Sequence, residues 1–211
     1  FANDTMEGAF PSATALMTIG CGADIGPQPS GNLQIAEGHG RAIGGEVQRL
    51  LGDGMSELGG APVVAGTTVQ LPLVDPKPRA YWEELKAKGG FDGQLGLAML
   101  KRLDAGKGIP SHVPYPVTSW QFGKDLAMVF LPGEVVVDYS VRLNRELAWS
   151  RLWITAWANG MPGYIPSRRV LAEGGYEADF SQVYYEQPGR YKPEVEEVVV
   201  GAVHRVVGKK F

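Results

Sequence analysis

The sequence predicts an α/β fold in which helices flank a mixed sheet. Segments with the apolar alternation of strands take turns along the chain with segments that have helical periodicity. Hydrophobic residues make up 44% of the 211 residues, an ordinary globular content that can fill one core. The chain contains no internal repeat and no low-complexity tract. We therefore expect residues 1–211 to form a single domain.

The first half of the chain is predicted to contain two strands and three helices. A loop rich in glycine and proline, residues 20–31, follows the first strand. The first helix is predicted to end near Gly52, and the glycine-rich segment 89–93 between the other two is predicted to be an exposed lid or insertion. The predicted strands are 13–20, which we expect to be buried, and 63–74. The predicted helices are 33–51, with an apolar face at Ala36, Ile43, Val47 and Leu50, then 78–88 and 93–105.

The second half is predicted to contain three strands and two longer helices. The tight turn 123–125 predicts a β-hairpin between its two flanking strands. One helix follows Glu134. The other has Pro193 in its first turn and acidic residues at its positive end. The predicted strands are 113–122, 126–131 and 151–158, and the last predicted helix is 193–207.

Composition argues against three features: a nucleic-acid partner, a transmembrane segment and an internal disulfide. The 20 basic and 23 acidic residues give a net charge of −3 and form no long run of either sign, so we expect no nucleic-acid partner. No apolar run reaches the roughly 20 residues that cross a bilayer, so we expect no transmembrane segment. The single cysteine, Cys21, excludes an internal disulfide and is most simply a small buried hydrophobic residue.

The two ends of the chain differ in character. The start, Phe1 to Met6, has neither an initiator methionine nor the pattern of a signal peptide. We therefore expect that an N-terminal part of the domain precedes Phe1. The last residues, 208–211, follow a complete predicted helix, which is typical of a natural end.

Four residues predict a metal or acid/base site. Tyr164 and Tyr176 stand twelve residues apart in a segment built from turn residues, where a tyrosine is costly unless its hydroxyl finds a partner. Glu134 follows a Leu-Pro-Gly turn where an apolar run ends, and Asp24 lies in the loop 20–31. Each follows a predicted strand, and sites gather at strand ends in open α/β sheets. We expect the Glu134 carboxylate and the Tyr164 hydroxyl to approach within about 5 Å, as ligands of one ion do.

Structural roles are alternatives for these residues. Glu134 could be an exposed acid near a helix N-terminus, Tyr176 a core tyrosine, and Asp24 a residue that orients its own loop. The histidines have no zinc-motif spacing: His39 is predicted to pack on a helix face, His204 to be structural, and His112 to lie near a site only as a weak alternative. The loop 20–31 lacks the Gly-Lys-Ser/Thr ending of a phosphate loop.

Taken together, these motifs resemble the catalytic domain of the neutral/alkaline non-lysosomal ceramidases and their bacterial relatives, which are zinc amidohydrolases. The resemblance covers most of the chain as the C-terminal portion of that domain. It implies that Glu134, in Pro-Gly-Glu, is a zinc-binding carboxylate and that Tyr164, in the segment 159–167, is a further zinc ligand. It also implies that Tyr176 lines the site and that two zinc-binding histidines lie upstream of Phe1.

The resemblance implies a function and a location as well. The expected function is zinc-dependent hydrolysis of a small-molecule or lipid amide, an N-acyl linkage like that of ceramide, as in sphingolipid metabolism. Secretion from a bacterium, to an extracellular or periplasmic location, is implied by the same relatives. Tyr176 and Asp24 are the candidate catalytic residues, with Tyr164 or Tyr176 stabilising the developing oxyanion.

One position departs from the family pattern. The family nucleophile is a serine in Gly-Asp-Val-Ser-Pro-Asn, and the matching segment 22–28 has Gly26 in its place. Ser30 is too far along the chain to replace it, so metal-bound water is the expected nucleophile. Two alternatives stay open: a non-catalytic binding or structural module with this fold, and a hydrolase of a non-lipid amide. We expect the 211-residue chain by itself to be inactive.

Overall fold

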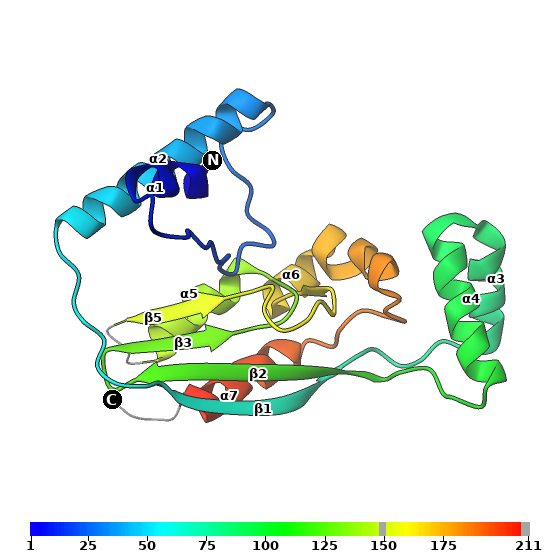
Figure 1. Ribbon diagram of the computed structural model, residues 1–211. Coiled ribbons are helices and arrows are strands. Elements are labelled where there is room, and N and C mark those ends of the chain that lie inside the picture. The colour runs from blue at the N-terminus through cyan, green and yellow to red at the C-terminus, as the bar shows by residue number, and fades with distance from the viewer. Residues whose placement is uncertain (148–150, 208–211) are drawn as a thin grey trace.

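The computed structural model describes residues 1–147 and 151–207. Its centre is a four-stranded mixed sheet in the order β1-β2-β3-β5 (Figure 1). The predicted α/β class with a mixed sheet is confirmed. The strands of this sheet are β1 (Val63–Pro72), β2 (His112–Phe122), β3 (Leu126–Phe130) and β5 (Leu152–Thr155).

Strand pairing follows the predicted connections. β1 and β2 run antiparallel, and β2 and β3 form the hairpin expected at residues 123–125. β5 joins β3 in parallel, because α5 (Val137–Glu146) carries the chain back to the same end of the sheet. β5 is therefore an edge strand and is shorter than the predicted strand 151–158.

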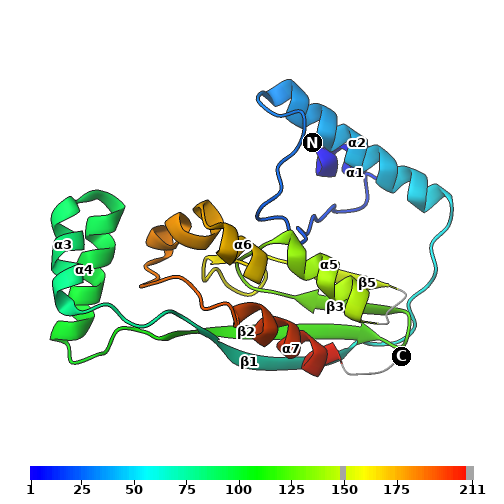
Figure 2. The same ribbon diagram turned by 180° about the vertical axis from the view of Figure 1, so that it is seen from behind.

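Two helices cover one face of the sheet. α5 and α7 (Val195–Val207) lie side by side on this face, as Figure 2 shows from behind. Six valines and an alanine of α7 are buried. The predicted last helix is present, but it begins at Val195, so Pro193 precedes it and does not lie in its first turn. Arg142 of α5 reaches Glu196 and Glu197 of α7 at 2.7 Å each, so an ion-pair network links the two helices.

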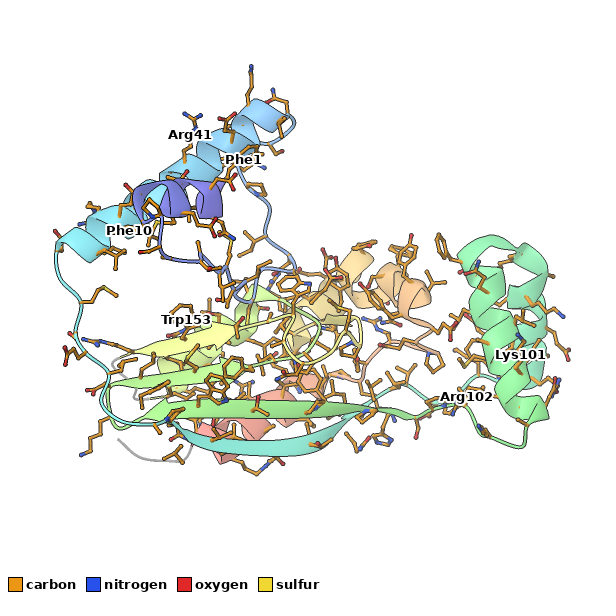
Figure 3. All side chains as sticks on the ribbon, in the orientation of Figure 1. Phe1, Phe10, Arg41, Lys101, Arg102 and Trp153 are labelled. Atoms are coloured by element: carbon orange, nitrogen blue, oxygen red, sulfur yellow. The ribbon has the colours of Figure 1, made fainter. Side chains whose placement is uncertain are left out.

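The opposite face of the sheet carries a row of apolar side chains. Trp120 pairs with Val64 on one side and with Met128 on the other, and Met128 pairs with Trp153. Residues paired across neighbouring strands point to the same face. Trp120 and Trp153 are exposed to 43% and 50%, and Figure 3 shows Trp153 at the β5 edge. The predicted strand 151–158 is thus only half-buried.

A pair of helices stands apart from the sheet (Figure 1). α1 (Ala2–Ala9) was not expected from the sequence, whereas α2 (Leu33–Gly52) matches the prediction, including its end at Gly52. The helices meet through Gly40 and Gly44, where a Cβ would lie 2.4 Å and 2.7 Å from the Cβ atoms of Phe1 and Thr5. The glycines form the packed side, and the expected apolar face at Ile43, Val47 and Leu50 is exposed.

The predicted buried strand at 13–20 is wrong. These residues form no strand, and Leu16, Met17 and Ile19 are more than half exposed. The Ile19 carbonyl accepts hydrogen bonds from the Ala156 N–H (2.8 Å) and the Thr155 hydroxyl (2.9 Å), so the segment touches the sheet only at its end. Apolar composition favoured a strand, but among the described residues no strand pairs with this segment.

A helical hairpin lies beyond the ends of β1 and β2 (Figures 1 and 3). It consists of α3 (Arg79–Lys88) and α4 (Gly90–Asp104), with a small core of its own around Trp82 and Met99. α4 begins at Gly90, so most of the predicted connecting segment 89–93 is helical. Its glycines allow close helix packing, because a Cβ on Gly96 would meet the Trp82 carbonyl at 2.7 Å.

Candidate functional site

Glu134 and Tyr164 face each other in a second, two-stranded parallel sheet. β4 (Glu134–Val135) and β6 (Tyr164–Ile165) pair with Glu134 opposite Tyr164. The Glu134 N–H donates to the Gly163 carbonyl at 2.9 Å. The sequence grouped these two residues, and the structure places them side by side in this small sheet.

Two glycines let the strands approach this closely. Gly133 has φ +77°, and a Cβ there would lie 2.4 Å from the Gly163 carbonyl oxygen. Gly163 has φ +113°, and its Cβ would lie 3.0 Å from the ring of Tyr185. Both conformations favour glycine, and both positions have backbone or ring atoms where a side chain would be. The Pro-Gly-Glu turn and the Pro-Gly-Tyr turn therefore fit together through their glycines.

Tyr164 and Tyr185 lie against the Glu134 carboxylate, and Tyr176 packs on Tyr164. The Tyr185 hydroxyl donates a hydrogen bond to Glu134 Oε1. The rings of Tyr164 and Tyr176 meet edge to face, with centroids 5.4 Å apart and planes at 81°. Tyr176 begins the π-helix η1 (Tyr176–Phe180) and is 47% exposed, so it stands at the outer side of the cluster. The Glu134 cluster, as we call it, consists of Glu134, Tyr164, Tyr176 and Tyr185.

Electrostatics keep two of these phenols protonated. Burial raises the pKa of Tyr164 well above its usual range, and a hydrogen bond to Glu134 raises it further. The same two causes, burial first, raise the pKa of Tyr185 to about 12. Beside an ionised carboxylate a phenol stays neutral and donates its proton. The phenols of Tyr164 and Tyr185 are therefore hydrogen-bond donors at neutral pH.

The loop 20–31 borders the strand that carries Glu134. The Ala23 N–H donates to the Val135 carbonyl at 3.2 Å. Asp24 Oδ1 accepts the Val137 N–H at 2.8 Å, at the first residue of α5, and Asp24 Oδ2 lies 3.3 Å from Arg169. Both carboxylate oxygens are occupied, which favours the alternative in which Asp24 orients its loop. The expected strand before this loop is absent, and the α5 contact holds the loop instead.

The side chains of the three histidines make their hydrogen bonds with residues outside the Glu134 cluster. His39 contacts the Pro29 carbonyl at 2.8 Å, His112 contacts the Ser111 hydroxyl at 3.0 Å, and His204 contacts Glu146 at 3.0 Å. Within residues 1–147 and 151–207, no three His, Cys, Asp or Glu side chains group so as to hold a metal ion. The donors present for a cation in the Glu134 cluster are oxygens: one carboxylate and its neighbouring phenols. Carboxylate oxygen is a zinc ligand, and a positive charge would favour a phenolate.

Gly26 and Cys21, both in the loop 20–31, differ in their exposure to solvent. Gly26 is exposed, and a Cβ there would meet nothing within 4 Å. Cys21 is 6% exposed, as predicted for a small buried hydrophobic residue, and burial raises the pKa of its thiol to about 12.

Sequence reasoning missed Tyr185. It lies in the 3₁₀ segment η2 (Ser181–Tyr185), which resembles neither a periodic helix nor a turn with glycine. The sequence holds one weak signal, the adjacent Tyr184 and Tyr185, because a tyrosine that becomes buried usually finds a hydrogen-bond partner for its hydroxyl. Tyr184 is 51% exposed and packs on Phe91 of the helical hairpin, while Tyr185 turns toward Glu134.

The fold and the cluster together define a mixed α/β domain with a carboxylate and tyrosine site on a separate small sheet. Among solved structures, the crystal structure of neutral ceramidase from Pseudomonas aeruginosa is similar, with a TM-score of 0.57 and 15% identity. The match covers 99% of this chain and 39% of that chain. A ceramidase complexed with C2 matches 49% of this chain and 16% of that chain, at 18% identity and a TM-score of 0.32.

The ceramidase likeness predicted from the sequence is confirmed at the level of the fold. No protein-family model and no curated protein sequence matches the chain. The chain spans about two fifths of the neutral ceramidase that it resembles. In the described residues, no helix combines the length and hydropathy that a membrane span requires.

Proposed function

We propose that this chain forms part of a zinc-dependent amide hydrolase that cleaves an N-acyl linkage of the ceramide type. The observation that carries the proposal is the Glu134 cluster: a carboxylate opposite Tyr164, within a fold similar to that of neutral ceramidase. An apolar core alone would not need a partly buried carboxylate surrounded by phenols, because a charge is costly there without a function or a partner.

The proposal assigns Glu134 and Tyr164 as two oxygen ligands of the zinc ion. Structural and catalytic zinc sites have about four ligands, so the remaining protein ligands would come from residues outside this sequence. When bound, zinc supplies a Lewis acid and lowers the pKa of a coordinated water. The residues of this chain hold the ion and orient the carbonyl of the substrate. The proposed ligand Tyr164 has to release its proton to bind as a phenolate.

Tyr176 and Asp24 are proposed to serve the reaction from either side. The exposed position of Tyr176 next to Tyr164 suits a donor to the substrate carbonyl oxygen, where charge develops. Asp24 is proposed to act by holding the loop 20–31 against β4. The amide substrate is a small molecule or a lipid. Secretion and a bacterial source stay part of the proposal because they rest on the resemblance.

A second candidate function rests on Gly26. The loop has no hydroxyl at the position that matches the family serine, which suits a binding module that kept the fold without catalysis. Hydrolysis of a non-lipid amide is the third possibility. Gly26 has open space around it, so Gly26→Ser fits without a clash and can separate these functions.

The test combines metal content with hydrolysis. Zinc is measured in the 211-residue chain and in a protein extended upstream of Phe1, each as wild type, Glu134→Gln and Tyr164→Phe. Glu84→Gln, on an exposed position of α3, is the matched control. We expect both site variants to weaken zinc binding at least tenfold and the control to leave it unchanged. Near-stoichiometric zinc in both site variants would show that Glu134 and Tyr164 are not zinc ligands.

Hydrolysis of a fluorescent N-acyl amide, with a long-chain and a short-chain acyl group, then distinguishes the candidates. Activity in the wild-type extended protein excludes the binding module. Activity only after Gly26→Ser indicates a hydrolase that has lost its nucleophile. A preference for the short-chain substrate supports the non-lipid amide.

A further inference from the structure

Three buried tyrosines outside the Glu134 cluster belong to the main hydrophobic core. Tyr115 comes from β2 and Tyr139 from α5. Tyr191 comes from the segment that leads into α7, where it forms an isolated bridge with Leu73, the residue after β1. Their side chains are 0%, 0% and 1% exposed. A buried hydroxyl is costly without a hydrogen bond, so phenylalanine would be the simpler residue at each position unless the hydroxyl has a role.

Two of the three hydroxyls donate hydrogen bonds to backbone carbonyls next to β4 and β6. Tyr115 donates to the Pro132 carbonyl at 2.8 Å, two residues before Glu134. Tyr139 donates to the Pro166 carbonyl at 3.1 Å, two residues after Tyr164. The turn before β4 is therefore held by the main sheet, and the backbone just after β6 by the helix packed on that sheet. Both tyrosines belong to the same closely packed hydrophobic core.

We propose that Tyr115 and Tyr139 are positioning residues that fix β4 relative to β6 and so set the placement of Glu134 against Tyr164. The small sheet is too short to define its own geometry, because each strand has two residues and their ladder has few hydrogen bonds. The hydrogen bonds from Tyr115 and Tyr139 add constraints on the backbone that the two-residue strands lack. The proposal extends the proposed function, since it names what holds that site, but the positioning itself can be measured without any reaction.

Tyr191 provides a matched control within the same core. Its hydroxyl is buried and has no hydrogen-bond partner among the described residues. Tyr191→Phe removes a buried hydroxyl of the same kind without removing a contact to either turn. Any effect shared by all three Tyr→Phe variants reports on the core in general. An effect seen only in Tyr115→Phe and Tyr139→Phe is due to loss of their hydrogen bonds to Pro132 and Pro166.

The first measurement is nuclear magnetic resonance of the full chain labelled at the tyrosine Cζ carbons. The Cζ shifts of Tyr164 and Tyr185 report the hydrogen bonding of their hydroxyls with Glu134. We expect both shifts to change in Tyr115→Phe and in Tyr139→Phe and to stay at their wild-type values in Tyr191→Phe. Tyr81, on the helical hairpin, serves as the reporter of the remaining fold in every variant. Unchanged Tyr164 and Tyr185 shifts in folded Tyr115→Phe and Tyr139→Phe would overturn the proposal.

The second measurement is zinc affinity in the protein extended upstream of Phe1. Loss of an outer hydrogen bond that orients a ligand typically costs 10–100-fold in metal affinity, so we expect a weakening of about tenfold for each anchor variant and none for Tyr191→Phe. Equal weakening in all three variants would assign the effect to core stability and overturn positioning. If Glu134→Gln does not weaken zinc binding, the proposed function fails, and the resonance shifts alone decide the positioning proposal.

Discussion

Glu134 and Tyr164 stand opposite each other in a parallel two-stranded sheet that is separate from the main sheet of the protein. Parallel strands need a crossover, and here the crossover between β4 and β6 includes α5 and β5, two elements of the main core. The site is thereby connected to the packing of the whole domain. Substitutions at the turns of this small sheet are expected to report on both stability and site geometry.

Gly133→Ala is expected to separate the two turns of the small sheet. An alanine at φ +77° is strained, and its Cβ would lie 2.4 Å from the Gly163 carbonyl oxygen. A left-handed non-glycine residue costs about 1–2 kcal/mol, and the backbone clash adds to this, so we expect a loss of about 2 kcal/mol or more. Urea unfolding of Gly133→Ala measures the loss. Gly26→Ala, which meets nothing within 4 Å, is the control and should stay within about 0.5 kcal/mol of wild type.

Asp24 is predicted to act through its two contacts, which substitutions can separate. Asp24→Asn keeps an oxygen for the Val137 N–H and loses the charge that faces Arg169, and Asp24→Ala loses both. The half-exposed Arg169 pair contributes little, about 0.2–1 kcal/mol, whereas a lost helix N-terminal acceptor costs about 1 kcal/mol. We expect the free energy of unfolding to fall in the order wild type, Asn, Ala. An Asn variant less stable than the Ala variant would contradict this assignment.

Much of the fold was predictable because its signals are local. The hairpin at 123–125, the alternation of 63–74 and the acidic first turn of the last helix are each contained in a few residues, and the structure has all three. The strand predicted at 13–20 failed because a strand depends on a partner, and apolar composition does not specify one. α1 was missed because its packing depends on Gly40 and Gly44, which lie far away in the sequence.

The site was predictable only in part for a similar reason. The Pro-Gly turns before Glu134 and Tyr164 are visible in the sequence, so these residues could be singled out. Their pairing depends on how the turns fit together through Gly133 and Gly163, which no local pattern shows. Tyr185 reaches the same carboxylate from a segment without periodicity. A contact of this kind is set by tertiary packing alone.

Zinc binding is predicted to release a proton from the Glu134 cluster. Burial and the neighbouring carboxylate raise the pKa of Tyr164, so this phenol is protonated at neutral pH and must lose its proton to act as a ligand. Calorimetric titration of the protein extended upstream of Phe1, in two buffers of different ionisation enthalpy, counts the released protons. We expect Tyr164→Phe to release about one proton fewer than wild type. Equal proton release in both proteins would exclude Tyr164 as a zinc ligand.

Alkaline stability is predicted to depend on Tyr185. Burial and Glu134 raise the pKa of this phenol from 10.0 to about 12 in the folded chain. Between these two pH values the unfolded chain releases the proton and the folded chain keeps it. The folded state then binds more protons, so its stability falls as the pH rises. The contribution of Tyr185 is fully present below about pH 10 and is lost as the pH passes about 12.

Urea unfolding at a series of pH values from about 8 upward, in steps of about one pH unit, tests this dependence. We expect the fall in stability above about pH 10 to be shallower in Tyr185→Phe than in wild type, because one phenol with a raised pKa has been removed. Glu134→Gln should also make the fall shallower, since it removes the charge that contributes to the Tyr185 shift. The buried phenols of Tyr115 and Tyr139, whose pKa values burial also raises, leave part of the fall in place in both variants. Parallel curves for wild type and Tyr185→Phe would show that Tyr185 does not hold its proton beside Glu134.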